Sequence, residues 1–192
     1  MTLPANLDLD TIRHRLAANQ PVTHPPSRPW QAATAMVFTP GERGPELAFI
    51  RRAERRGDRF SGDMALPGGV RSPADHDLSV TAARETHEEV GIELPPPAGR
   101  LDDLRGRTRR GLVATYGFVL DHQPRLHPAP AEVAEALWIP LHALFDPAAS
   151  TSVRWAGIPF PAIDYHGRVI WGLTHRMLQT LGSVLGAELA TR

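Results

Sequence analysis

One stretch of the sequence, Gly68 to Ile92, constrains the fold most strongly, because it joins a glycine turn to a short helix rich in carboxylates. The turn, Pro67-Gly68-Gly69, permits backbone dihedrals closed to other residues and lets the main chain come close to a ligand. A helix is predicted over 77–90, and Gly91 supplies the left-handed residue that ends it. Small residues share one face of this helix: Ser79, Ala82, Ala83, Thr86 and Val90.

A second face of this helix is predicted to gather three carboxylates, those of Glu85, Glu88 and Glu89. Like charges one turn apart destabilise a bare helix by roughly a few tenths of a kcal/mol, so three in one patch need a neutralising partner. A divalent cation would neutralise them, and magnesium suits oxygen ligands without histidine or thiol among them. The alternative interpretation is an acidic helix face open to solvent beside an ordinary turn.

Fixed positions in this stretch resemble the signature of the Nudix hydrolases: Gly69, Arg84-Glu85, Glu88-Glu89 and Gly91-Ile92. Asp75 stands at the first acidic position of that signature. The resemblance implies an α/β fold of the α+β kind, the Nudix α/β/α sandwich with a mixed central sheet. In this fold a loop-helix-loop motif lies against the sheet and binds metal and a diphosphate.

The composition bounds the classes of protein that this chain can represent. At 192 residues the chain can form one domain with a full core, and we expect an N-terminal helical arm and proline-rich connector over 1–30, then a Nudix hydrolase domain over 31–192. The absence of cysteine excludes disulfides, thiolate metal sites and cysteine nucleophiles. The formal charge of zero gives no global field to recruit nucleic acid or a membrane surface. The first thirty residues lack the apolar segment of a signal peptide and no run could span a membrane, so we expect a soluble, cytoplasmic protein.

The remaining pattern predicts an ordered succession of elements. An amphipathic helix over 9–16 and a connector over 21–29, which cannot enter a sheet, should form an arm over the main body. Strands are expected over 31–38, 46–51, 64–66 and 112–120, the first two as a hairpin. A second hairpin, turning at His166-Gly167, should lead into a helix that ends near residue 189. An apolar stripe indicates that this last helix packs in the core: Trp171, Met177, Leu178, Leu181, Val184, Leu185 and Leu189.

The stretch 132–141 resembles the part of Nudix domains in which Glu-Val precedes a strand ending in Trp-x-Pro-Leu. The loop before that strand commonly carries one more carboxylate near the metals. By this resemblance Glu132 is the first candidate and Glu135 the second for the base that deprotonates the attacking water. A glutamate of the helix acting with the metal is a further candidate, and both residues could instead be solvent carboxylates beside the site.

The resemblance also implies roles for individual residues. Glu85 and Glu89 would be the principal ligands of magnesium, or of manganese in its place, with Glu88 as a third ligand or a water-mediated contact. Arg84 would pair with a glutamate and fix its rotamer. Together with Glu132 these residues form the predicted catalytic set: Glu85, Glu88, Glu132 and Arg84.

Substrate binding is assigned to Arg52, Gly68 and Gly69. Arginines cluster over 51–59 and 105–110, where either a solvated loop or a segment that grips phosphate would account for them. Arg52 matches an arginine of the family, and a guanidinium fork fits phosphate oxygens. The histidines have no convincing zinc spacing, and we expect His87 to be exposed.

Two further segments resemble the coenzyme A diphosphatase branch of the family: the spacing of residues 68–75, with Ser72 in place of an aspartate, and Ile170-Trp171-Gly172-Leu173-Thr174. The implied function is magnesium-dependent cleavage of the diphosphate of a nucleoside diphosphate linked to another group, coenzyme A or a derivative first. Hydrolysis of NADH, ADP-ribose or another nucleotide sugar is the alternative, and a non-catalytic nucleotide-sensing Nudix module is a remote one. The expected partner is a small nucleotide substrate. We expect no binding to nucleic acid or to a membrane, and the chain could form a homodimer.

Overall fold

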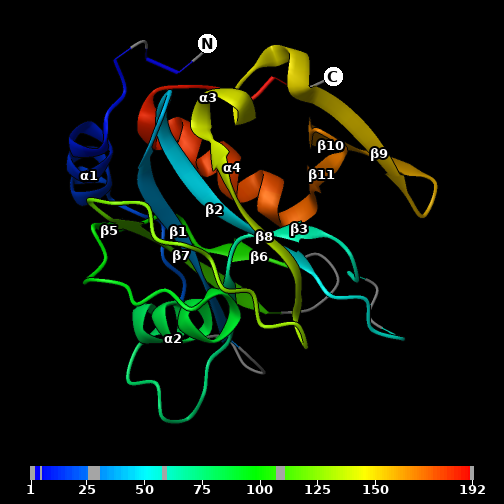
Figure 1. The fold of residues 1–192 in the computed structure, drawn as a ribbon, viewed down its shortest axis with the longest axis horizontal. Helices are drawn as coiled ribbons and strands as arrows, with labels where there is room; N and C mark the ends of the chain where they lie inside the picture. The colour runs from blue at the N-terminus through cyan, green and yellow to red at the C-terminus, as the bar shows by residue number, and fades with distance from the viewer. Residues whose placement is uncertain (1–2, 5, 26–30, 58–59, 107–110, 191–192) are drawn as a thin grey trace.

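The computed structural model describes residues 3–4, 6–25, 31–57, 60–106 and 111–190 (Figure 1). The predicted connector beyond residue 25 lies outside these residues, as do Arg59, Arg107, Arg109 and Arg110 of the arginine clusters. Among the described residues, no helix combines the length and the apolar character that crossing a bilayer requires.

A mixed sheet of eight strands forms the centre of the molecule. Its longest strands are β1 (Gln31–Gly41), β2 (Gly44–Arg52), β7 (Leu112–Val119) and β8 (Val133–Pro140). The shorter ones are β3 (Met64–Ala65), β4 (Gly68–Val70), β5 (Gly99–Arg100) and β6 (Leu104–Arg105). β1 pairs parallel with β7 and antiparallel with β2 and β4, while β8 pairs antiparallel with β2. The predicted hairpin, the short strand over 64–66 and the strand over 112–120 are therefore confirmed, with ends that differ by at most three residues.

A second, three-stranded sheet follows the first along the chain. It consists of β9 (Ser150–Trp155), β10 (Ile158–Tyr165) and β11 (Arg168–Trp171), each antiparallel to its neighbour. The short α3 (Leu141–Leu144) and the 3₁₀ turn Pro147–Ala149 connect the two sheets. The turn at His166-Gly167 is confirmed, whereas the sequence pattern did not indicate β9 or the two-residue strands β5 and β6.

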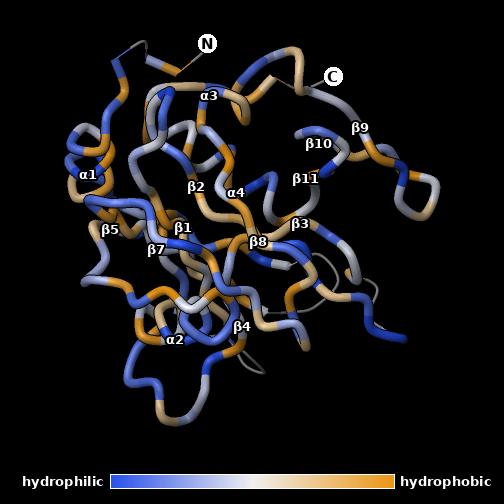
Figure 2. Tube along the Cα trace, in the orientation of Figure 1, coloured by the Kyte–Doolittle hydropathy of each residue, from blue (hydrophilic) through white to orange (hydrophobic). Residues whose placement is uncertain are grey.

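The central sheet is covered by helices on both faces (Figure 1). Helix α2 (Leu78–Val90) lies on one face, while α1 (Leu9–Ala18) and α4 (Gly172–Leu185) lie on the other. Figure 2 shows hydrophobic residues along the central strands and mainly hydrophilic ones in the loop that leads into α2. The arrangement is the predicted α/β/α sandwich.

Alternating residues of β1 serve the two faces. Ala33, Ala35 and Val37 belong to the core under α2, and their small side chains let that helix lie close to the sheet. Met36 and Phe38 point to the opposite core, which α1 and α4 complete. Each side chain of β1 therefore points to one face only. Side chains can meet at a site only if they lie on the same face.

The helix α1 packs as an arm over the main body, as predicted. Its Ile12 and Leu16 are fully buried. Leu16 fits against Gly99 and Gly117, where a Cβ atom on either glycine would collide with it. The arm is thus a packed part of the core.

Two expectations about the last helix were wrong. The helix α4 ends at Leu185 and does not reach residue 189, because Gly186 adopts a left-handed conformation with φ of 68° and closes the last turn. Trp171 lies in β11, before the helix, and so does not belong to its core stripe. The helix residues Met177, Leu178, Leu181 and Leu185 are buried as predicted.

The buried face of α2 also differs from the prediction. Its buried residues are Leu78, Thr81, Ala82, Thr86, Glu89 and Val90. Ser79 and Ala83, predicted to share one face with Ala82, Thr86 and Val90, are only partly buried. The face that meets the sheet therefore includes Glu89, which removes one carboxylate from the predicted acidic patch.

Candidate active site

Arg84 holds together the loop and the helix on the α2 face. Its guanidinium donates to both carboxylate oxygens of Asp75, at 3.1 and 3.0 Å, and to the carbonyl of Val70 at 3.2 Å. It also lies 2.9 Å from oxygens of Glu85 and of Glu88. One arginine thus links three carboxylates to the glycine loop.

Asp75 is the buried anchor of this network. It is 3% exposed and accepts hydrogen bonds from the amide of Ser72 and the hydroxyl of Thr81. The Arg84 hydrogen bonds, and then the bonds from Ser72 and Thr81, hold the pKa of Asp75 at about 2. Asp75 is therefore ionised at neutral pH and fixes Arg84 in place.

Glu89 lies buried beneath the glycine loop. It is 5% exposed, and its Oε2 accepts a hydrogen bond of 2.8 Å from the amide of Gly68. Burial, opposed by this hydrogen bond and assisted by the nearby charges of Glu85 and Glu132, raises the pKa of Glu89 to about 7. The positive charge that the protein places near the Glu89 carboxylate is therefore too small to offset the cost of burying it.

The glycines of the loop are required by close contacts. Gly68 has φ of 152°, and a Cβ atom there would collide with the carbonyl of Ala33. A Cβ atom on Gly69 would fall on the carboxylate of Glu85. The loop can therefore lie directly on the two glutamates of the helix. A side chain at Gly68 would displace the loop, whereas one at Gly69 would displace the carboxylate of Glu85.

The predicted patch of three carboxylates is divided. Successive helix residues are about 100° apart, so Glu88 and Glu89 cannot share one direction. Glu88 has a side chain that is 56% exposed and pairs with Arg84, whereas Glu89 faces the sheet. Glu85 lies between them, and burial raises its pKa. Glu85 and Glu89 are the pair that the structure brings under the loop, and His87 is exposed as expected.

Glu132 and Glu135 lie on opposite faces of the sheet. The charge of Glu132 raises the pKa values of Glu85 and Glu89, which places it on the α2 face. Glu135 instead pairs with Arg51 and with Arg168 of β11, on the α4 face. Glu135 belongs to β8, whereas Glu132 precedes that strand, in the turn before Val133.

Two arginines border the site on the α2 face. The charge of Arg52 lowers the pKa of Glu89 against the larger effect of burial, so Arg52 lies near that carboxylate. Arg55 donates 2.8 Å to the carbonyl of Ala131 and lies 3.0 Å from Oε1 of Glu132. The neighbouring Arg51 points to the other face, so of these residues Arg52 and Arg55 are placed to meet a ligand.

Residues 29–156, more than half of the chain, match the sequence profile of the NUDIX domain. The chain belongs to the Nudix family. It is 33% identical over 156 residues to the human mitochondrial coenzyme A diphosphatase NUDT8. The matched stretch covers 77% of this chain and 66% of that protein. It is 39% identical over 119 residues to an uncharacterized protein of Schizosaccharomyces pombe, across 57% of this chain and 36% of that protein. The chain thus spans just under two thirds of the human relative and about a third of the yeast one.

A solved structure shows the same fold at low sequence identity. The MutT/nudix family protein from Enterococcus faecalis aligns with a TM-score of 0.58 at 13% identity, over 87% of this chain and 71% of that one. At this identity the likeness concerns the Nudix fold alone.

Nudix hydrolases generally use divalent metal ions, and the residues on the α2 face fit such an ion. Within the described ranges, no three or more His, Asp or Glu side chains already form a metal cluster. Glu85 and Glu89 nevertheless have raised pKa values and repel each other and Glu132, which a cation between them would relieve. Oxygen donors alone are what Mg²⁺ and Mn²⁺ prefer. These glutamates would therefore hold the ion.

Sequence reasoning missed two members of this site. Asp75 matched an acidic position of the motif, but its role as the buried partner of Arg84 was not indicated. Arg55 was noted within an arginine cluster and as a possible reader of a substrate phosphate, but not as the partner of Glu132. The signal available for the Asp75–Arg84 pair was an acidic residue nine positions before an arginine, next to the predicted start of a helix. The Arg55–Glu132 pair joins segments far apart in the chain and has no local signal.

Proposed function

We propose that the protein is a magnesium-dependent Nudix hydrolase that cleaves the diphosphate of coenzyme A or of an acyl derivative. The products would be adenosine 3′,5′-bisphosphate and a 4′-phosphopantetheine. The observation that carries this proposal is the buried Glu89, one helical turn from Glu85, under a glycine loop and near Arg52. The resemblance to a human coenzyme A diphosphatase supports the substrate class.

The residues divide the work of hydrolysis between them. A bound Mg²⁺ would neutralise the diphosphate oxygens and lower the pKa of water at the site. Glu85 and Glu89 would hold it. Glu132 would accept the proton of the attacking water as the new P–O bond forms, and the bridging P–O bond would break with its electron pair leaving on the departing phosphate.

Three arginines would support this reaction in different ways. Arg52 would donate hydrogen bonds to phosphate oxygens, for which its planar guanidinium is suited. Arg55 would orient Glu132 through the contact at 3.0 Å. Arg84, bound to Asp75, would hold Glu85 in a fixed rotamer.

A second link to the substrate class comes from the segment Ile170 to Thr174, which resembles the coenzyme A diphosphatase branch. Its Trp171 donates to Asp63 at 3.1 Å and its Thr174 donates to the carbonyl of Met64 at 3.3 Å. Both partners lie a few residues before the glycine loop. The segment therefore supports the part of the chain that carries the diphosphate site.

A hydrolysis screen tests the proposal. Initial rates with saturating magnesium would be compared for coenzyme A, dephospho-coenzyme A, NADH, ADP-ribose and diadenosine polyphosphates, with the products identified by mass. We expect coenzyme A to have the highest kcat/KM, and dephospho-coenzyme A to be poorer if Arg52 or Arg55 contacts the 3′-phosphate. A tenfold preference for NADH or ADP-ribose, about 1.4 kcal/mol of transition-state binding, would overturn the substrate assignment and leave a Nudix hydrolase of another nucleotide.

Other features stay predictions. The cytoplasmic location, the domain boundary at residue 30 and a homodimer are not tested by the fold. The human relative is named as mitochondrial, so the location in particular needs direct measurement.

A further inference from the structure

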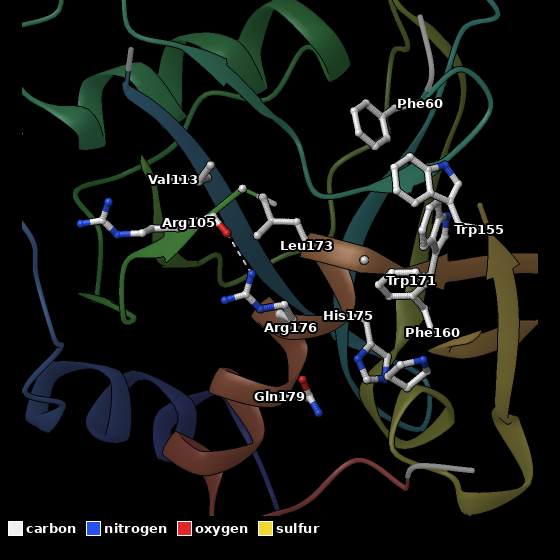
Figure 3. Close-up of a pocket in the computed structure, with 13 residues that line it drawn as sticks. Phe60, Arg105, Val113, Trp155, Phe160, Trp171, Leu173, His175, Arg176 and Gln179 are labelled. Atoms are coloured by element: carbon white, nitrogen blue, oxygen red, sulfur yellow. Dashed lines mark hydrogen bonds between the residues drawn. The ribbon is translucent and has the colours of Figure 1, made fainter. Parts of the chain in front are cut away.

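Trp171, at the end of β11, is held in place by its neighbours on the α4 face. With Trp155 and Phe160 it lines one side of a cavity of about 770 Å³, as Figure 3 shows. These three rings, here called the aromatic wall, contact one another with centroid distances of 6.3, 6.2 and 5.9 Å. His175 also lines the cavity, and burial lowers its pKa, so that its imidazole is neutral at physiological pH. The aromatic wall therefore fixes the position of the Trp171 indole.

The polar edge of this indole meets the chain shortly before the glycine loop. Its Nε1 donates a hydrogen bond of 3.1 Å to Oδ1 of Asp63, a residue 108 positions earlier in the chain. Hydrogen bonds to a carboxylate are stronger than those between neutral groups, and this one is partly buried. The bond therefore ties the three-stranded sheet to the segment that leads into the diphosphate site.

The backbone of this segment holds the end of β2, where Arg52 lies. The carbonyl of Asp63 accepts a hydrogen bond of 3.1 Å from the amide of Arg52, and the amide of Gly62 donates to the carbonyl of Arg52 at 3.2 Å. These contacts continue the pairing of Met64 with Arg51, so the tie along β2 extends beyond β3. Both polar groups of the Arg52 main chain are therefore bonded to Gly62 and Asp63.

The other side of the same stretch meets the residue proposed as the base. The amide of Ala53 donates 2.8 Å to the carbonyl of Glu132, and Arg52 pairs with Val133 of β8. The end of β2 thus lies between Asp63 on one side and Glu132 on the other. A shift of this stretch would move the proposed phosphate ligand and the proposed base together.

We propose that Trp171 is a positioning residue for the hydrolysis, and that it acts through its hydrogen bond to Asp63 to hold the end of β2. Arg52 then meets the phosphate oxygens, and Glu132 meets the attacking water, in one fixed geometry. The inference rests on the proposed function, because it takes Arg52 as the phosphate ligand and Glu132 as the base. Misplacement of such groups by about 1 Å lowers a rate by up to about a hundredfold, so loss of this one support should lower kcat/KM about tenfold.

The first test replaces Trp171 with Phe, which keeps a ring in the aromatic wall and removes the indole N–H. For coenzyme A at saturating magnesium, the loss of about tenfold should be divided about equally between a lower kcat and a higher KM, because both groups are displaced. Trp155→Phe is the matched control. Its ring contacts Trp171 at 6.2 Å, and across the described part of the chain its indole has no hydrogen-bond partner. It should change kcat/KM less than twofold, and equal losses in the two variants would overturn the proposal.

The acceptor of the hydrogen bond is tested separately. Asp63→Asn keeps a side-chain oxygen that can accept from the indole and should lower kcat/KM less than threefold, whereas Asp63→Ala should lower it about tenfold. The double variant of Trp171→Phe and Asp63→Ala should lose no more than either single variant, because both changes delete one bond. Additive losses, or an Asn variant as impaired as the Ala variant, would show that the bond does not carry the effect.

The remaining measurements separate positioning from folding and from the choice of substrate. A purely structural role of Trp171 predicts a lower melting temperature without the change in kcat and KM, and that result would overturn the inference alone. Should NADH or ADP-ribose be cleaved and coenzyme A not, the proposed substrate is wrong. The same variants are then measured with the nucleotide that is cleaved, and the same tenfold loss decides the positioning role. A wild type that cleaves none of these nucleotides would overturn both proposals.

Discussion

The two faces of the central sheet differ in the kind of residue that each presents. The α2 face carries titratable groups in close contact with their partners: Arg84 with Asp75, and Glu89 beneath Gly68. The α4 face carries aromatic rings around a cavity and a neutral histidine. The contacts of Arg84 and Glu89 on the charged face all lie within residues 68–89, whereas the apolar face is assembled from residues far apart in the chain. The groups proposed to cleave the bond are therefore confined to one face of the sheet.

Glu132 and Glu135 show the same separation on a small scale. Glu135 lies in β8 and pairs with Arg51 and Arg168, whereas Glu132 lies in the turn before β8 and pairs with Arg55. The charge of Glu132 raises the pKa of Glu89 on α2. The hydrogen bond from Arg168 and the nearby Arg51 lower the pKa of Glu135, which makes it a weaker base as well as a distant one. We therefore retain Glu132 as the proposed base.

The largest expected effect is that of Glu89→Gln, which removes a buried charge from the α2 face without changing side-chain volume. Turnover of coenzyme A at saturating magnesium should fall about a thousandfold, or roughly 4 kcal/mol of transition-state stabilisation. At pH 4.5 and below, where the wild-type carboxyl is protonated, circular dichroism and the melting temperature should stay near those of the wild type, because Gln can still accept the hydrogen bond from Gly68. Near-normal turnover would show that α2 is not the metal site and would break the assignment of chemistry to this face.

A smaller kinetic effect is expected for Glu132→Gln. As a base that acts in the transition state, Glu132 should lower kcat by about a hundredfold when replaced, with a much smaller rise in KM. If Glu135→Gln were the more damaging change, the base would be Glu135, and if neither variant were affected, the base would be a glutamate of α2.

The sequence predicted the α2 face better than the α4 face for a physical reason. The contacts of Gly68, Glu85 and Glu89 lie within one loop and one helix, so their spacing is nearly a local property. The aromatic wall joins Trp155, Phe160 and Trp171 from three strands, and only the pairing of β9, β10 and β11 brings them together. Periodicity assigned Trp171 to a helix stripe because it immediately precedes an amphipathic helix.

The same distinction explains the errors on the α2 face itself. Helical spacing places Glu85, Glu88 and Glu89 within one arc of the helix, but spacing alone does not decide which part of that arc meets the sheet. The alanines of β1 accept the helix at a rotation that buries Glu89 and exposes Glu88. The role of Asp75 depended on the fold of the loop over 71–77, which brings it back to Arg84.

Burial of Glu89 predicts a pH dependence of stability in the metal-free protein. Its pKa rises from an ordinary 4.5 to about 7 on folding, so its contribution to stability is fully present below pH 4.5 and is lost as the pH rises through 7. Between these values the free energy of unfolding of the wild type should fall by about 3 kcal/mol relative to Glu89→Gln. Urea denaturation in EDTA at several pH values measures this difference. Parallel curves for the two proteins would mean that Glu89 is solvated, and the contrast between the faces would weaken.

The smallest effect is expected on the α4 face, for Glu135→Gln. Glu135 joins Arg51 of β2 to Arg168 of β11, and its partly exposed ion pairs should contribute only about 1 kcal/mol to the free energy of unfolding. The variant should therefore melt a few degrees lower, while kcat and KM for coenzyme A change less than twofold. Arg168→Gln is the matched change in the partner, and since the two side chains interact directly, the double variant should lose less stability than the sum of the single ones. Additive losses would show that the pair contributes nothing, and a hundredfold loss of kcat in Glu135→Gln would show that the groups that cleave the bond are not confined to one face of the sheet.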